Sequence, residues 1–310
     1  MLASSFLQSL YRIVAGPRLR WAHDPQLWVE LFVTANLAIL AADIFIAHSL
    51  NAFARSAEYI PLCFSAGASL LLAVIVALRW IGRFEKPWRR IGYAIGWISI
   101  LTGLAGVLYH LESRFFLDTT LKSLTYAAPF AAPLAYTGLG FLLILNRMVP
   151  PRSAEWARWV IFLATGGFFG NFILSLTDHA SNGFFLRTEW IPVISSAFAV
   201  GFLAVPLVLA VTRRFLDYCL IILLAQALVG VLGFWFHMRA NLIEPGHTLM
   251  EKLVNGAPPM APLLFPNLVG LAMIGLWAVI PHLPEADRAR SWLGSTYRWV
   301  HPESESGSRP

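Results

Sequence analysis

Long apolar segments separated by short polar ones dominate the chain between residues 26 and 281. Eight of these segments have close to the about 20 residues that an α-helix needs to cross a hydrocarbon core. They cover residues 26–47, 60–80, 91–110, 127–146, 157–178, 190–211, 216–237 and 259–281. The pattern therefore predicts an all-α integral membrane protein with eight transmembrane helices.

The composition agrees with this pattern and excludes a soluble enzyme. Of the 310 residues, 57% are hydrophobic and only 13% are charged, whereas soluble domains carry about 25% charged residues. The expected environment of the chain is thus a lipid bilayer.

The net charge of +6 follows the predicted topology and does not indicate nucleic acid binding. If the N-terminus is cytoplasmic, 17 of the 23 Lys and Arg residues lie in inner segments and six in outer loops. Basic residues collect on the cytoplasmic side of membrane proteins. We therefore expect both termini in the cytoplasm and a bacterial inner membrane as the location.

The chain contains two similar halves. Residues 48–84 align without a gap with residues 179–215, and 15 of the 37 positions are identical. Both copies share the pattern H-x-x-N-x-F-x-x-x-x-E-[YW]-I-P-x-x-x-S-A. A second motif, A-P-x-x-A-P-L, occurs at residues 128–134 and again at residues 257–263. The sequence thus predicts an internal duplication.

Each predicted copy has four spans, so both copies run in the same direction across the membrane. We expect two tandem four-helix bundles related by a pseudo-twofold axis along the membrane normal. The predicted division is a cytoplasmic interfacial segment (1–25), a first repeat (26–147), a second repeat (157–281) and a cytoplasmic polar tail (282–310). Paired glycines on the third span of each repeat favour close helix contact; they are Gly103, Gly106, Gly230 and Gly233.

Polar residues retained in both copies collect at the predicted outer face. Four are histidines at the outer ends of the first and third spans: His48, His110, His179 and His237. A single histidine there could cap a helix. Lys, Arg, Gly or Asn would cap equally well, so retention of all four favours metal binding, haem ligation or proton exchange.

The carboxylates and amides beside these histidines are the other candidate site residues. Glu58 and Glu189 precede their spans and could stabilise a helix start, orient an imidazole or accept a proton. Asp178 precedes His179 directly and is a further candidate acid. Asn51 and Asn182 could turn the chain or contact a cofactor. Glu30, near the cytoplasmic end of the first span, is expected to reach water.

The leading hypothesis is membrane redox chemistry at this outer cluster. The histidines would bind haem b or a copper, iron or zinc ion, or serve a quinone site. Nearby aromatic residues could line a flat cofactor. Expected partners beyond the lipid are other membrane subunits or a soluble redox protein at the outer face.

Two alternatives belong to other functional classes. Tandem repeats about a membrane-normal axis also build permeases for solutes or metal ions, although no polar residue retained in both copies lies at mid-membrane. The chain could also be a non-catalytic assembly subunit whose His and Glu residues are structural. The absorption spectrum and metal content of the purified protein would separate these classes.

In outline, two tandem four-helix bundles with four outer histidines resemble the haem A synthases. That family carries a Glu-x-x-His-Arg signature and has its histidine ligands on the second and fourth helices of each bundle. This chain has no such signature, and its four histidines end the first and third spans. The paired bundles also resemble the quinol-handling membrane subunits of the polysulfide-reductase type, without a shared motif. The sequence is therefore assigned to neither family.

Overall fold

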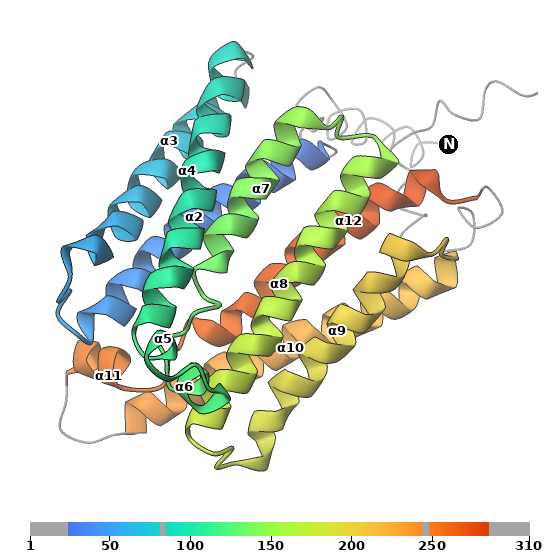
Figure 1. The fold of residues 1–310 in the computed structure, drawn as a ribbon. Helices are drawn as coiled ribbons and strands as arrows, with labels where there is room; N and C mark the ends of the chain where they lie inside the picture. Colours follow the sequence, from blue (N-terminus) through green and yellow to red (C-terminus); the bar gives the residue numbers. More distant parts are fainter. Residues whose placement is uncertain (1–23, 81–84, 244–247, 285–310) are drawn as a thin grey trace, which may run out of the picture.

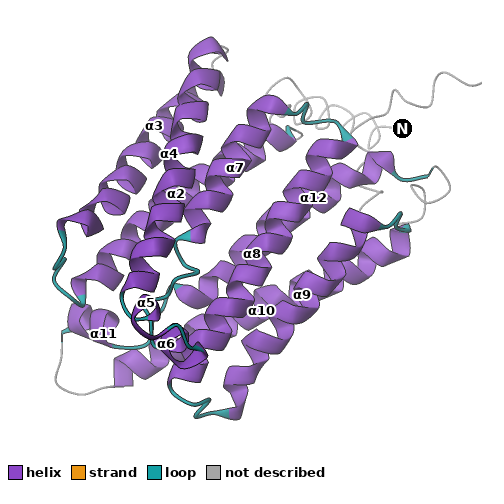
Figure 2. Ribbon diagram, in the orientation of Figure 1, coloured by secondary structure: helices purple, strands orange, loops and turns teal. Residues whose placement is uncertain are grey.

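A computed structural model describes residues 24–80, 85–243 and 248–284, and these residues form helices joined by turns and loops (Figures 1 and 2). The longer helices are α2 (Pro25–Ser49), α3 (Tyr59–Trp80), α4 (Glu85–Glu112), α7 (Leu134–Met148), α8 (Ala154–Ser181), α9 (Trp190–Val208), α10 (Arg213–Ile243) and α12 (Leu264–Val279). Shorter helices are α5 (Phe115–Asp118), α6 (Leu121–Thr125) and α11 (Leu249–Asn255). Single 3-10 turns are η2 (Ser56–Glu58), η3 (Arg187–Glu189), η4 (Ala261–Leu263) and η5 (Ile280–His282). The predicted all-α class is confirmed.

Among the described residues, seven helical segments are long and apolar enough to cross a membrane, which confirms an integral membrane protein. They are Pro25–Ser49, Ser56–Leu78, Pro87–Glu112, Ala154–Ser181, Arg187–Val208, Arg213–Ile243 and Ala261–His282. The fourth predicted span, residues 127–146, is instead the shorter apolar helix α7. Pro129 and Pro133 lack a backbone N–H, so the chain before residue 134 forms turns and the helix begins late.

The long helices run side by side in one bundle (Figure 1). Its interior is built from side chains with no exposed surface, such as Leu37 of α2, Leu143 of α7, Ile161 of α8 and Leu276 of α12. Large apolar side chains elsewhere face outward; they include Leu70 of α3, Leu101 of α4 and Leu228 of α10. Exposed apolar surface on that scale fits a lipid environment.

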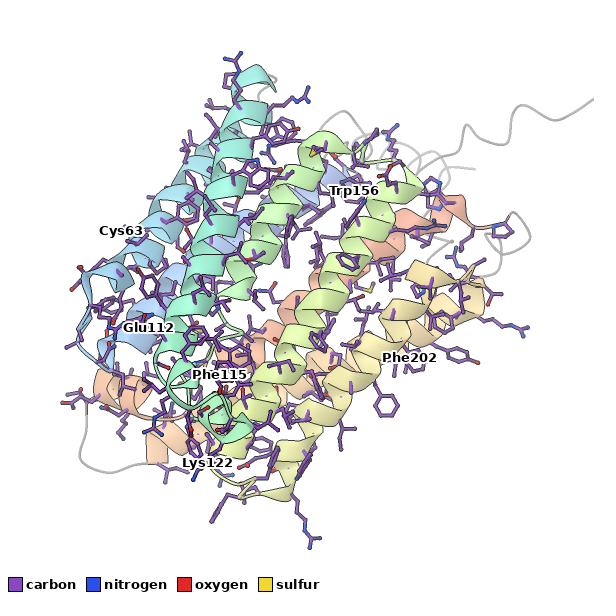
Figure 3. The ribbon with its side chains drawn as sticks, in the orientation of Figure 1. Cys63, Glu112, Phe115, Lys122, Trp156 and Phe202 are labelled. Atoms are coloured by element: carbon purple, nitrogen blue, oxygen red, sulfur yellow. The ribbon has the colours of Figure 1, made fainter. Side chains whose placement is uncertain are left out.

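The short helices α5, α6 and α11 lie together at one end of the bundle (Figure 1). This is the end at which α2, α4, α8 and α10 finish, so it corresponds to the predicted outer face. Glu112, Phe115 and Lys122 mark it in Figure 3. The structure therefore gathers these connections beside the ends of the histidine-bearing helices, and this end of the bundle is called outer below, after the predicted orientation.

Two stretches of sequence carry predictions that lie almost wholly outside the described residues. They are the interfacial segment 1–25, of which residues 24 and 25 are described, and the polar tail 282–310, of which residues 282–284 are described. Helix α2 begins at Pro25 because the Asp24 side chain accepts a hydrogen bond from the Gln26 N–H at 3.0 Å. An aspartate at this position satisfies one of the unpaired N–H groups of the first turn.

The paired glycines lie at close helix contacts, as predicted. A Cβ atom on Gly103 would be 2.8 Å from the carbonyl oxygen of Pro133, and one on Gly230 would be 2.7 Å from that of Pro262. A Cβ atom on Gly106 or Gly233 would lie 2.7 or 2.9 Å from the Cβ of the same two prolines. These distances are shorter than carbon side chains tolerate, so α4 and α10 each need glycine where the A-P-x-x-A-P-L segment packs against them.

Candidate functional site

The first outer cluster is centred on His48, in the last turn of α2. Its Nδ1 atom lies 3.1 Å from Oε2 of Glu58, in the 3-10 turn that leads into α3. The other carboxylate oxygen accepts hydrogen bonds from the Asn51 side chain at 3.2 Å and from the Arg55 backbone N–H at 3.3 Å. The loop between α2 and α3 therefore fixes the carboxylate against the imidazole.

His110, in the last turn of α4, completes this cluster. The centres of the His48 and His110 rings are 6.3 Å apart. Nδ1 of His110 lies 2.9 Å from the carbonyl oxygen of Pro129. A carbonyl only accepts hydrogen bonds, so Nδ1 carries the hydrogen, and Nε2 of the neutral ring keeps a free lone pair.

The second cluster repeats these contacts at the ends of α8 and α10. Nδ1 of His179 lies 3.6 Å from Oε2 of Glu189. Nδ1 of His237 lies 2.8 Å from the carbonyl oxygen of Pro258. Each half of the chain thus contains one His–carboxylate pair and one His–carbonyl pair.

Both clusters are largely enclosed. The side chains of His48 and Glu58 are 23% and 13% exposed, and those of His179 and Glu189 are 20% and 14% exposed. The Oε2 atoms of both glutamates are buried and accept no hydrogen bond of good geometry from the described residues. A buried carboxylate oxygen without a polar partner is costly. His48 supplies that partner to Glu58, and His179 supplies it to Glu189.

Two of the predicted site residues are not part of these contacts. Asn182 ends α8, where its backbone N–H donates to the carbonyl of Ala180. Within the described part of the chain its side chain makes no bond like that of Asn51 to Glu58. The carboxylate of Asp178 likewise makes no hydrogen bond or ion pair with a described residue. Of the nine predicted side chains, four therefore form two His–Glu pairs, and Asn51 supports one of these pairs. His110 and His237 contact proline carbonyls.

A strained phenylalanine accompanies each cluster. Phe53 and Phe184 both have φ near +52°, in the left-handed region that bulky residues rarely adopt. Their backbone N–H groups donate to the carbonyls of His48 and His179, at 3.0 and 2.9 Å. Strain of this kind costs about 1–3 kcal/mol and gathers at functional sites.

These phenylalanine rings lie beside the histidines. The ring centre of Phe53 is 5.9 Å from that of His48, and the ring centre of Phe184 is 6.2 Å from that of His179. Each phenylalanine also stacks on the aromatic residue that begins the next helix, Tyr59 at 4.6 Å or Trp190 at 3.9 Å. The strained turn therefore places an apolar ring beside His48 in the first cluster and beside His179 in the second.

Sequence reasoning missed the role of the A-P-x-x-A-P-L segments. The first proline of each segment supplies the carbonyl that contacts His110 or His237. The alanine before it is anchored by a side chain near the end of α4 or α10: Ala128 N–H donates to Ser113 Oγ, and Ala257 N–H donates to Asn241 Oδ1. The repetition of the motif was the available signal, but a backbone carbonyl leaves no trace in residue types.

A buried ion pair near the opposite end of the bundle was also missed. Glu30 was expected to reach water, and this prediction is wrong. Its side chain and that of Arg147 are fully buried, with Nη1 2.7 Å and Nη2 3.2 Å from the two carboxylate oxygens. The partner residue lies 117 positions away on α7, so no local pattern could reveal it.

Among the described residues, no group of three or more His, Cys, Asp and Glu side chains is placed to hold a metal ion. Each outer cluster instead offers two imidazoles. The chain matches no protein-family model, no curated protein and no solved structure. Its function is therefore inferred from its own residues, and the two outer clusters are the candidate site.

Proposed function

We propose that the chain is an integral membrane redox protein that holds a b-type haem between two imidazoles at the outer end of each half. The ligands would be His48 with His110 and His179 with His237. The observation that carries the proposal is the recurrence of the same His–carboxylate and His–carbonyl pairing at both clusters. Interfacial caps alone would need neither the carboxylate nor the second imidazole.

The proposal treats the two halves as copies of one four-span unit, related by a pseudo-twofold axis along the membrane normal. Equivalent contacts support this duplication. The glycine–proline packing, the left-handed phenylalanines and the His–carbonyl contacts all recur in both halves. In this scheme α7 is the fourth helix of the first copy and α12 that of the second.

The geometry of the first cluster is compatible with bis-imidazole ligation. Metal–imidazole bonds are about 2.0–2.1 Å long, so ring centres 6.3 Å apart leave room for one metal atom bound by a nitrogen of each ring. A haem would need only two ligands from the protein, because its porphyrin supplies the others. The supply of two imidazoles per cluster fits that requirement better than a bare zinc or copper ion, which needs more protein ligands.

The polar partners of the imidazoles support the same assignment. Metal-binding histidines usually donate their second ring N–H to a carboxylate or a backbone carbonyl, which fixes the ring and leaves the other nitrogen for the metal. Pro129 and Pro258 supply such carbonyls. Glu58 and Glu189 would orient the other two rings and accept a proton when the charge of the site changes.

A haem bound in this way supplies one-electron transfer. The chain's own residues hold the imidazoles, exclude water with the phenylalanine rings and provide carboxylates as proton acceptors. The electron partner would be another membrane subunit or a soluble protein at the outer face. We place the protein in a bacterial inner membrane with both termini in the cytoplasm, on the basis of its positive-inside charge bias.

The orientation predicts which introduced cysteines react from outside the cell. With Cys63 replaced by Ser, because it is exposed, a cysteine at Ala54 should react with a membrane-impermeant maleimide added to intact cells. A cysteine at Arg152, in the loop between α7 and α8, should react only after the cells are opened. Both positions are exposed, and in the proposed orientation they lie on opposite sides of the membrane. The reverse pattern would overturn the orientation.

Haem content provides the direct test of the proposed site. The purified protein should show the absorption spectrum of a low-spin b-type haem and contain about two haem irons per chain, one for each cluster. The His110→Ala variant should retain about half of the haem, because only the first cluster loses a ligand. Replacing His110 and His237 together should remove nearly all of it.

The matched control is His282→Ala, which removes an exposed histidine at the other end of the bundle and should leave the spectrum unchanged. A colourless, metal-free wild-type protein would contradict the proposal and leave the four histidines as structural caps. Stoichiometric copper or zinc without haem would also contradict it, in favour of a metal-ion site at the same residues.

A further inference from the structure

A groove of about 490 Å³ runs along α9 in the second half of the chain, and every residue that lines it is apolar. Helix α8 contributes Phe172, and α10 contributes Phe215. The groove is open on the outside of the bundle, because Phe198 at its edge is 55% exposed. Figure 3 labels Phe202, another lining residue, on α9. All three helices are candidate membrane spans, so the opening faces lipid.

Small residues form the floor of the groove. Ala197 and Gly201 are one helical turn apart on α9, between the larger side chains of Phe198 and Phe202. A Cβ atom on Gly201 would meet nothing within 4 Å. Along α9 the lining extends from Val193 to Val205, a rise of about 18 Å at 1.5 Å per residue. The shape therefore suits a long hydrocarbon chain with short methyl branches, which enters sideways from the bilayer.

The outer end of the groove adjoins the second histidine cluster. On α9, Val193 lies one turn after Glu189, about 6 Å along the axis. On α8, Phe172 lies seven residues before His179, which places the two side chains on the same helix face. Both helices thus lead from the apolar groove to the His179–Glu189 pair.

The first half lacks the residues that shape this groove. In the alignment of the two halves, Leu70 stands at the position of Gly201, Gly67 at that of Phe198 and Leu71 at that of Phe202. Gly201, Phe198 and Phe202 therefore have no equivalent in the first half, whereas Phe215 aligns with Phe84. Packing needs shared by both halves do not account for such a difference.

From this placement we infer that the groove binds the isoprenoid tail of a membrane quinone, with the quinone ring at its outer end beside His179 and Glu189. This inference names the electron-carrying partner of the second cluster and so rests on the proposed redox function. Both ring nitrogens of His179 are already engaged, one by Glu189 and the other by the proposed haem. The ring contact is therefore assigned to the Glu189 carboxylate, which would accept a hydrogen bond from a quinol hydroxyl. A neutral ring suits the outer end, because a phosphate group there would be repelled by the Glu189 carboxylate.

Filling the groove should weaken binding of a tailed quinone and spare its ring. The Gly201→Leu variant places the residue of the first half on the groove floor. We expect the Kd of a ubiquinone with a long isoprenoid tail, followed by quenching of tryptophan fluorescence in detergent, to rise at least tenfold. The Kd of the tail-less ring analogue should not change, because the groove holds only the tail.

The matched control is Gly166→Leu, since Gly166 lies on α8 outside the groove lining and also has open space around it. It should bind both quinones like the wild type.

If Gly201→Leu does not fold, Phe198→Ala, which removes one side of the groove, should weaken binding of the tailed quinone alone. Unchanged affinity for the tailed quinone in a folded groove variant would overturn the inference. So would displacement of the quinone from the wild-type protein by phosphatidylglycerol vesicles, which would identify a phospholipid site.

Haem content measured on the same samples separates this inference from the proposed function. Quinone binding that depends on the groove in a protein without haem would leave the inference standing and refute bis-imidazole ligation. A protein with two haems that binds no tailed quinone would support the proposed function and refute the inference.

Discussion

A Glu30→Gln variant is expected to lose about 3–5 kcal/mol of unfolding free energy, the usual cost of removing one partner from a buried ion pair. The reason is that the Arg147 guanidinium would stay buried opposite a neutral amide. Both side chains are fully buried and contact each other through two N–O distances of 2.7 and 3.2 Å. The loss would appear as a lower midpoint of thermal unfolding in detergent, followed by circular dichroism.

The surroundings of this ion pair explain why the guanidinium cannot find water instead. Arg147 also donates to the Leu143 carbonyl at 2.7 Å and lies 4.4 Å from the ring centre of Trp88. A Cβ atom on Gly92 would overlap the guanidinium at 1.9 Å, so α4 closes tightly over it. Four helices meet here, because Asn146 of α7 links Glu30 of α2 to Trp156 of α8, and α4 packs over the guanidinium. Trp156 is labelled in Figure 3.

Two comparisons make the prediction specific to the buried charge. The exposed Glu155, at the start of α8, should tolerate the same change to Gln with little effect. A double variant, Glu30→Leu with Arg147→Met, should be more stable than Glu30→Gln, because no unpaired charge stays buried. If Glu30→Gln melts like Glu155→Gln, the guanidinium is hydrated and the buried pair does not exist in the protein.

Local patterns in the sequence predicted those features that depend on neighbouring residues. The lengths of the apolar segments predicted the membrane helices, and the glycines of α4 and α10 indicated where helices approach closely. The late start of α7 was missed because hydropathy averages over Pro129 and Pro133, whose missing N–H groups interrupt the helix. Hydropathy describes the transfer of side chains out of water and contains no information on backbone hydrogen bonds.

At the outer site, residue types were predictable and their contacts were not. The repeat of His, Glu and Asn indicated a shared arrangement, and the His48–Glu58 and His179–Glu189 pairs follow from it. Asn51 and Asn182 looked equivalent, yet only Asn51 reaches its glutamate. Such a difference depends on the local geometry of each loop, which the residue types of a pair do not encode.

The contact between α4 and α7 yields the second large effect, with opposite signs at two glycines on the same helix. A Cβ atom on Gly140 would lie 2.4 Å from the carbonyl oxygen of Gly96, a backbone atom that cannot move aside. Gly140→Ala should therefore force the helices apart and destabilise the protein by about 1–3 kcal/mol, the usual cost of overpacking. A Cβ atom on Gly138 would meet nothing within 4 Å. Gly138→Ala should stabilise the helix by up to about 1 kcal/mol, because alanine has the higher helix propensity. Thermal unfolding of the two variants in the same detergent measures both effects. A Gly140→Ala protein at least as stable as the wild type would show that α4 and α7 are not in backbone contact.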